Sequence, residues 1–226
     1  MRASRRLDQL PEQSGVEVVL FHDVLCAWSY VADQRLEQLR DELGPQLRWR
    51  YRGYPLRPEE KALDKRERKL LAGHFRRAAR EKEGAGVVAD LWTSSDPPRS
   101  SLPPLVALEA ALVQGEGAQR ALLRSLRQSA FLRGVNIARR DVLVELAESA
   151  SLDVGRFLRD LDDPRSLRAV EAGVDEAGLL GVRGVPALLI GDEWLMQGCR
   201  DLPDYRAALE KFLSERTAAP ALRTLH

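Results

Sequence analysis

Two cysteines, Cys26 and Cys199, are the candidate redox residues of this 226-residue chain. Cys26 follows a β-prone apolar run at 16–21 and precedes a helical pattern of apolar residues. The free N–H groups and the dipole of a helix N-terminus favour negative charge, so a cysteine at this position is expected to have a pKa of about 3.5–7.5. We therefore predict a reactive thiol at Cys26; a small buried core residue is the alternative.

The neighbours of Cys26 are the next candidates. Ser29 lies three positions later, and its hydroxyl can donate a hydrogen bond to the thiolate but cannot attack sulfur. Trp28 and Tyr30 are candidates for the walls of a substrate groove or for packing residues. His22, at the end of the apolar run, is either a general base or a structural histidine.

The first part of the chain predicts a strand, a helix and a second strand around Cys26. The run 16–21 is interrupted only by Glu17, which is typical of a strand covered on both faces. A helical pattern follows and ends at Leu43-Gly44-Pro45. Residues 47–52 alternate, with arginines at every second position, which predicts an edge strand with a solvated arginine face.

The middle and the end of the chain predict helices and then a hairpin. Residues 58–83 are dense in charge and predict exposed helix, whereas 84–104 predict a loop. Apolar stripes at 105–112, 122–130, 142–150 and 154–161 predict four helices. A helix starting at Asp163-Pro164 precedes two short apolar runs joined by Gly191-Asp192, which indicate a hairpin, and a last helix begins near Asp201.

The position of Cys199 depends on this hairpin. If residues 193–197 pair back along 187–190, the chain returns toward Pro186 and toward Cys26. Cys199 is therefore a candidate second thiol, although a structural cysteine is the alternative. A bridge between the two would need Cα atoms within about 7 Å.

Composition excludes several classes of protein. The chain has 35 Lys+Arg against 34 Asp+Glu, which argues against a dedicated nucleic-acid binder. No apolar run approaches the roughly 20 residues of a membrane span. Two cysteines cannot form a disulfide framework or a four-thiolate zinc site, and His74 and His226 have no partner at a suitable spacing, so we predict no metal. Residues 1–14 lack the apolar stretch of a secretory leader, and we expect flexible tails at 1–14 and 218–226 of a cytoplasmic protein.

Three motifs carry a resemblance to a known family. They are Cys26-Ala27-Trp28-Ser29-Tyr30 after the first strand, Gly184-Val185-Pro186 before the third, and Gly198 after the hairpin. With this order of elements, the chain resembles the DsbA-like branch of the thioredoxin superfamily over residues 16–215, especially its FrnE-like members. It is also similar to 2-hydroxychromene-2-carboxylate isomerases and kappa-class glutathione transferases. The resemblance implies an α/β thioredoxin fold (15–57 and 164–217) with an inserted all-helical domain (58–163).

The resemblance also implies how a substrate binds. Pro186 is expected to be cis and to lie beside Cys26, with the backbone of Val185 pairing with a peptide or with glutathione. Oxidoreductases of the family usually have a second cysteine where this chain has Ser29. What remains is monothiol chemistry, in which Cys26 captures glutathione or a protein disulfide and an outside thiol resolves the adduct.

We therefore expect a thiol–disulfide oxidoreductase with no tightly bound cofactor and with glutathione as a co-substrate. Its partners would be glutathione or a disulfide-bearing protein, with no nucleic acid and no membrane, as a monomer or a homodimer. One alternative is a glutathione-dependent isomerase or transferase, in which glutathione docked against Pro186 supplies the nucleophile. The other is a redox-inactive binding module that keeps only the groove.

Overall fold

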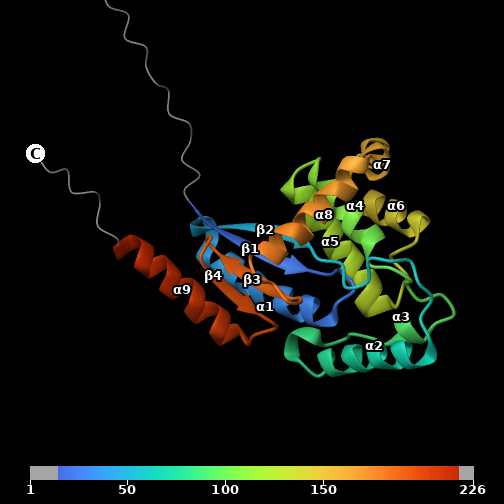
Figure 1. Ribbon diagram of the computed structural model, residues 1–226, viewed down its shortest axis with the longest axis horizontal. Helices are drawn as coiled ribbons and strands as arrows, with labels where there is room; N and C mark the ends of the chain where they lie inside the picture. Colours follow the sequence, from blue (N-terminus) through green and yellow to red (C-terminus); the bar gives the residue numbers. More distant parts are fainter. Residues whose placement is uncertain (1–14, 219–226) are drawn as a thin grey trace, which may run out of the picture.

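A four-stranded mixed sheet organises residues 15–218, the part of the chain that the computed structural model describes (Figure 1). The strand order is β2-β1-β3-β4. Central β1 (Val16–His22) is parallel to β2 (Leu47–Gly53) and antiparallel to β3 (Ala187–Ile190), which pairs with β4 (Trp194–Gln197). The covered first strand, the edge strand at 47–53 and the late hairpin are thus confirmed.

Helices cover both faces of the sheet. Helix α1 (Ala27–Leu43) and helix α9 (Leu202–Ala218) pack on one face, where Leu20 of β1 joins the same cluster as Leu36 and Leu209. Helix α8 (Pro164–Leu179) packs on the other face, where Phe21 joins a second cluster. Successive residues of β1 therefore point to opposite faces and are buried on both. The tail expected at 1–14, and all but the first residue of the tail expected at 218–226, lie outside the described residues.

Six helices lie between β2 and α8 in the sequence. They are α2 (Lys65–Ala78), α3 (Asp90–Thr93), α4 (Leu102–Leu112), α5 (Glu116–Arg127), α6 (Arg140–Ser149) and α7 (Val154–Asp162). Asp64 begins α2 as a cap, since its Oδ1 accepts from Glu67 N at 2.8 Å and Glu67 Oε2 accepts from Asp64 N at 2.9 Å. Helix α5 continues directly into a π-helical turn at Gln128–Leu132. The expected helices are present, and the short helix α3 lies within 84–104, where a loop was expected.

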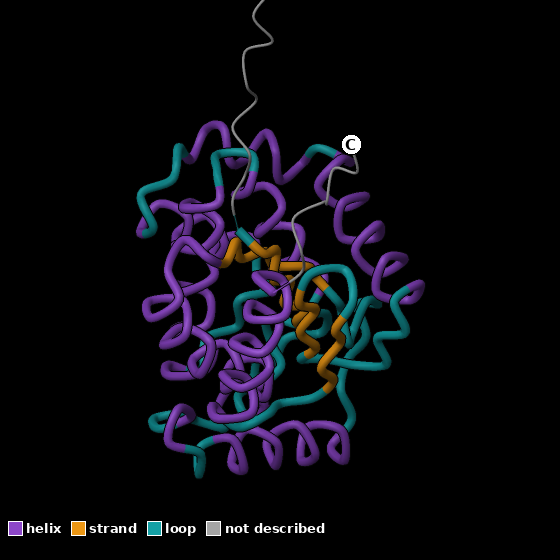
Figure 2. Tube along the Cα trace, turned by 90° about the vertical axis from the view of Figure 1, so that its left-hand side faces the viewer, coloured by secondary structure: helices purple, strands orange, loops and turns teal. Residues whose placement is uncertain are grey.

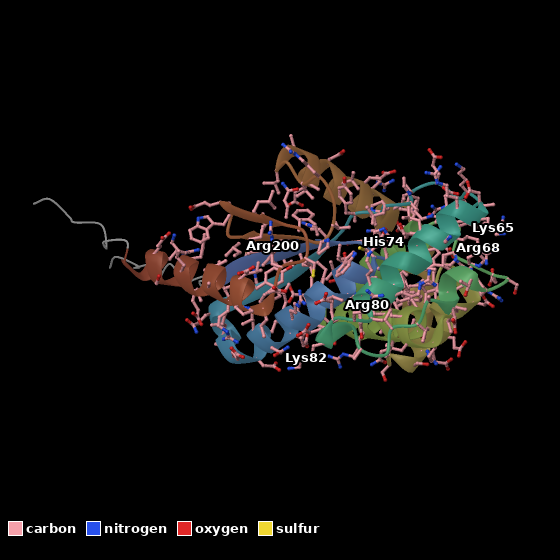
Figure 3. All side chains as sticks on the ribbon, turned by 90° about the horizontal axis from the view of Figure 1, so that it is seen from below. Lys65, Arg68, His74, Arg80, Lys82 and Arg200 are labelled. Carbon is pink, nitrogen blue, oxygen red and sulfur yellow. The ribbon has the colours of Figure 1, made fainter. Side chains whose placement is uncertain are left out.

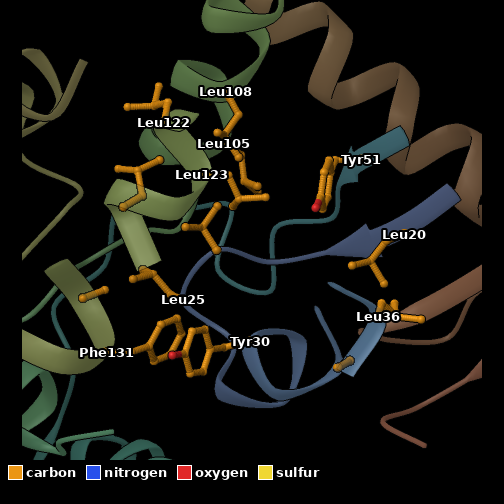
Figure 4. Packing of buried hydrophobic residues seen from close by; sticks show 14 of the residues in the cluster. Leu20, Leu25, Tyr30, Leu36, Tyr51, Leu105, Leu108, Leu122, Leu123 and Phe131 are labelled. Atoms are coloured by element: carbon orange, nitrogen blue, oxygen red, sulfur yellow. The ribbon is translucent and has the colours of Figure 1, made fainter. Parts of the chain in front are cut away.

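One hydrophobic cluster runs from the sheet into these helices. It contains Leu20 and Leu36 together with Leu105 of α4, Leu122 of α5 and Phe131 (Figure 4). Figure 2 shows the strands enclosed by helices on several sides. Because the helical segment shares a core with the thioredoxin-like part, the division into domains at 57/58 and 163/164 stays a prediction.

The arginine face of β2 differs from its prediction. Arg48 and Arg50 pair with Glu17 of β1, and Arg52 Nε lies 3.0 Å from Glu176 Oε2 of α8. Since α8 covers this face of the sheet, the side chain of Arg52 is only 23% exposed. The expectation of a solvated face is therefore wrong at Arg52, which a helix about 120 residues later in the chain covers, whereas the side chains of Arg48 and Arg50 remain 40% and 37% exposed.

Candidate active site

Cys26 lies where the loop after β1 enters α1. It is the N-cap residue of α1, with an extended backbone conformation, and its carbonyl accepts from Tyr30 N at 3.0 Å. Its Sγ faces the carbonyl oxygen of Val185 at 3.8 Å. The Val185–Pro186 peptide bond is cis, as predicted. The fold therefore brings the thiol and the proline loop together across 159 positions of sequence.

Burial decides the protonation state of this thiol. Desolvation raises the pKa of Cys26 above its ordinary value of 9.0 and outweighs the opposing influence of the Ser29 hydroxyl and of the backbone N–H groups of Trp28 and Ser29. The charge of Asp23 raises the pKa further. The expectation of a lowered pKa is therefore wrong: the helix N-terminus acts in the expected direction, but burial has the larger effect.

Ser29 stands where a second cysteine would be expected. Its side chain is fully buried, and its Oγ has no well-formed hydrogen bond among the described residues. The hydroxyl is nevertheless close enough to lower the pKa of the Cys26 thiol. A thiolate would supply the acceptor that this hydroxyl lacks.

An apolar cavity of about 210 Å³ opens beside Cys26. Leu25, Trp28 and Val185 line it from the thioredoxin-like part. The helical segment contributes Leu71, His74 and Phe75 of α2 and Trp92 of α3. Both parts of the fold therefore build the surface that a substrate next to the sulfur would touch.

His74 and Asp23 join the site although sequence reasoning assigned them no role. Figure 3 labels His74 on α2. Trp28 Nε1 donates to His74 Nδ1 at 3.3 Å, and burial together with Arg77 lowers the pKa of His74, which keeps it neutral. Burial raises the pKa of Asp23, whose Oδ1 accepts from Leu25 N and whose Oδ2 accepts from Leu56 N, each at 2.7 Å. Asp23 could have been found from the sequence, because it is an acidic residue three positions before Cys26. No sequence pattern pointed to His74, because its partner Trp28 is 46 positions away.

Tyr30 and His22 lie away from this cavity. Tyr30 stacks on Phe131 with ring centroids 4.8 Å apart and is 7% exposed (Figure 4). His22 is 1% exposed, and burial together with Arg127 lowers its pKa to about 3. Among the aromatic candidates, the structure places Trp28 in the cavity wall and Tyr30 in the core.

Cys199 follows β4 and is a free thiol, as is Cys26. Its Sγ accepts from Arg35 Nη1 of α1 at 3.5 Å. Cys26 is one of the groups whose charge acts on the pKa of Cys199, so the two thiols lie in one neighbourhood.

Residues 15–218 hold neither a metal cluster nor a membrane span. No group of three or more His, Cys, Asp or Glu side chains is arranged to hold a metal ion there. None of the helices in this range is long and apolar enough to cross a membrane.

Residues 17–210 match the family model of the DSBA-like thioredoxin domain, and the chain belongs to this family. The ClpXP adapter protein SpxH of Halalkalibacterium halodurans is 30% identical over 185 residues, which cover 79% of this chain and 59% of that protein. The SpxH of Bacillus subtilis is 28% identical over 179 residues, 76% of this chain and 57% of that protein. The chain thus spans about three fifths of the length of these curated relatives.

Solved structures share the fold. A putative protein disulfide isomerase from Nitrosomonas europaea has a TM-score of 0.80 at 15% identity, covering 89% of this chain and 98% of that one. The cytosolic disulfide reductase DsbM from Pseudomonas aeruginosa has a TM-score of 0.67 at 24% identity, covering 89% and 97%. A 2-hydroxychromene-2-carboxylate isomerase has a TM-score of 0.64 at 17% identity, covering 91% and 100%. The resemblance to the DsbA-like superfamily is confirmed.

Proposed function

We propose that this chain catalyses thiol–disulfide exchange as a monothiol through Cys26, with glutathione or a protein disulfide as its partner. The observation that supports this most is the contact of Cys26 Sγ with the Val185 carbonyl at 3.8 Å, on the wall of an apolar cavity. Because Cys26 lines this cavity, a partner's sulfur placed in it would lie next to the thiol.

The exchange would proceed in two balanced steps. The Cys26 thiolate attacks one sulfur of the partner's disulfide and forms a mixed disulfide, while the other sulfur leaves as a thiolate. An outside thiol then attacks the partner's sulfur and releases Cys26. Ser29 would donate to the Cys26 thiolate, and the backbone of Val185 would pair with the bound chain as an added strand.

Glutathione is the proposed small partner, and the cytoplasm the proposed compartment. A monothiol enzyme needs a supply of reducing thiol, which the cytoplasm provides. The structural neighbour DsbM is a cytosolic disulfide reductase that has also been solved with GSH. The small volume of the cavity suits the cysteinyl part of glutathione or one side chain of a peptide.

A second candidate is a binding module of adapter type. The relatives named SpxH are ClpXP adapter proteins, and the chain is 30% identical to one of them. The raised pKa of Cys26 and the serine at position 29 both favour a groove that binds a partner chain without redox chemistry. A glutathione-dependent isomerase is supported by the fold alone, which this chain shares with a solved 2-hydroxychromene-2-carboxylate isomerase.

Turnover of a glutathionylated peptide by reduced glutathione separates these functions. The wild type is expected to accelerate release of the peptide thiol, Cys26→Ala to lose the acceleration, and the exposed α6 variant Ser149→Ala to keep it. Equal acceleration by Cys26→Ala would contradict the proposal. No acceleration by any variant, with binding of extended peptides retained in Cys26→Ala, would favour the adapter.

A further inference from the structure

The chain that leaves β4 passes directly beside the loop that faces Cys26. Ala187 pairs with Gln197, and the next residue, Gly198, donates its N–H to Pro186 O at 2.8 Å. Cys199 therefore comes directly after Gly198, which is hydrogen-bonded to the Val185–Pro186 loop. The Val185 carbonyl of the same loop lies 3.8 Å from Cys26 Sγ. Cys26 and Cys199, which are more than 170 positions apart in the sequence, thus both lie next to the Val185–Pro186 loop.

The guanidinium of Arg35 contacts the thiol of Cys199. Arg35 of α1 is 6% exposed, and its Nη1 lies 3.5 Å from Cys199 Sγ while also donating to Arg200 O at 2.8 Å. Arg35 also pairs with Glu81, Glu83 and Asp201, so a thiolate at Cys199 would share this guanidinium with three carboxylates. Helix α1 thus holds one thiol at its first turn and a cation for the other two turns later.

We propose that Cys199 is the resolving thiol of this chain: it displaces the partner from the Cys26 mixed disulfide and closes a Cys26–Cys199 disulfide. This inference rests on the proposed function, because it needs Cys26 to form the mixed disulfide first. It gives the chain a second route besides resolution by an outside thiol, and it assigns to Cys199 the role that Ser29 cannot fill.

The reaction balances in atoms and electrons. The Cys26 thiolate attacks a disulfide RS–SR′, forms Cys26–S–S–R and releases R′S⁻. The Cys199 thiolate then attacks the Sγ of Cys26, forms the Cys26–Cys199 bond and releases RS⁻. Two thiols of the chain are oxidised, one partner disulfide is reduced to two thiols, and the two protons from the cysteines end on R and R′.

The surroundings of Cys199 make this step slower than the first. Burial raises the pKa of Cys199 to about 11, with Arg35 acting to lower it and Glu81, Cys26 and Asp201 acting to raise it. Closing the bridge also requires the Cα atoms to come within about 7 Å. Gly198 has a φ of 80° and no atom within 4 Å of a Cβ position, and its carbonyl accepts from the Tyr205 hydroxyl at 3.4 Å.

Intact mass after treatment with glutathione disulfide, at a pH of about 8.5 where more thiolate forms, tests the inference. In the wild type, the glutathionyl adduct on Cys26 is expected to disappear at least about tenfold faster than in Cys199→Ser and to leave a chain lighter by two hydrogens. Peptide mapping should show Cys26 joined to Cys199. Cys26→Ser should gain neither product.

The remaining outcomes distinguish failure of the resolving role from failure of the proposed function. An adduct that persists equally in the wild type and in Cys199→Ser overturns the resolving role and leaves the proposed function standing. No adduct in any variant overturns both. Cys199→Ala repeats the comparison in case serine disturbs packing.

Discussion

Burial at Cys26 competes with the effect of its helix. The thiol caps α1, where free N–H groups favour the anion, yet Leu71 and Phe75 of α2 close the cavity around it. Desolvation is the larger effect, and the pKa of Cys26 is raised. The resting thiol is therefore protonated at neutral pH, and reaction requires its ionisation.

The reactivity of Cys26 should rise steeply with pH. Because the pKa lies above 9.0, the fraction of thiolate, and with it the rate of alkylation by iodoacetamide, should grow about tenfold per pH unit from pH 6 to pH 8.5. The rate is followed by mass spectrometry of the peptide that contains Cys26. A plateau below pH 8 would show a lowered pKa and contradict this expectation.

Ser29→Ala should separate reactivity from stability. Removing the hydroxyl takes away a group that lowers the pKa of Cys26, so alkylation at pH 7.5 should slow several-fold. Ser29 Oγ is buried without a well-formed hydrogen bond in residues 15–218, so the free energy of unfolding should change by less than about 1 kcal/mol. Unchanged alkylation in this variant would remove Ser29 from the site.

At the scale of elements, a buried ion cluster joins α1, β2 and α5. Asp33 of α1 accepts from Arg40 Nη2 at 2.8 Å and from Tyr51 Oη at 3.0 Å, and it also pairs with Arg127. Burial alone would raise the pKa of Asp33, but the two guanidinium groups lower it to about 2. The cluster ties the helical segment to the helix that presents Cys26.

Asp33→Asn should therefore destabilise the fold strongly. It leaves Arg127, which is 2% exposed, without its carboxylate and leaves Arg40 with only Glu37 among residues 15–218, at a cost of about 3–5 kcal/mol in the free energy of unfolding. Urea unfolding measures this. Asp162→Asn, which breaks an exposed pair with Arg140, is the matched control and should have little effect; equal losses in the two variants would contradict the role of burial.

His22 should make the same cluster sensitive to acid. Its pKa is lowered to about 3 in the folded chain, whereas the unfolded value is 6.5, so unfolding takes up a proton between these pH values. Stability conferred by neutral His22 is present above pH 6.5 and declines as pH falls, by about 1.4 kcal/mol per pH unit. Between pH 7 and 5, the free energy of unfolding should fall toward this slope in the wild type and fall less steeply in His22→Gln. Identical slopes in the two proteins would contradict the role of His22.

At the scale of the whole molecule, local patterns predicted the elements but not their contacts. The apolar run at 16–21 and the hairpin at 187–197 predicted the sheet, and the motifs at Cys26 and Pro186 predicted the centre of the site. Local patterns act over a few residues, so they could not show that Arg127 would be buried or that His74 would reach Trp28. The choice between groove wall and packing residue for Tyr30 stayed open for the same reason, since Phe131, on which it stacks, lies about 100 positions away.

The docking of the helical segment on the thioredoxin-like part shapes the site most among the features that sequence patterns could not show. The segment closes the cavity over Cys26 through α2 and α3, and it shares the main hydrophobic cluster with the sheet. The pKa of the thiol, the shape of the groove and the stability of α1 all depend on that docking. A thioredoxin-like part without this segment would present a more exposed and more acidic thiol.

The site of glutathionylation is the decisive measurement for the role of Cys26. The chain is incubated with glutathione disulfide at pH 7.5 and 8.5, and intact mass and peptide mapping are compared for the wild type and Cys26→Ala. We expect attack through Cys26: a glutathionyl adduct on Cys26, or the Cys26–Cys199 disulfide that follows it, forming faster at the higher pH and absent in Cys26→Ala. Neither product in the wild type, or adduct formation on Cys199 that Cys26→Ala leaves unchanged, would contradict it.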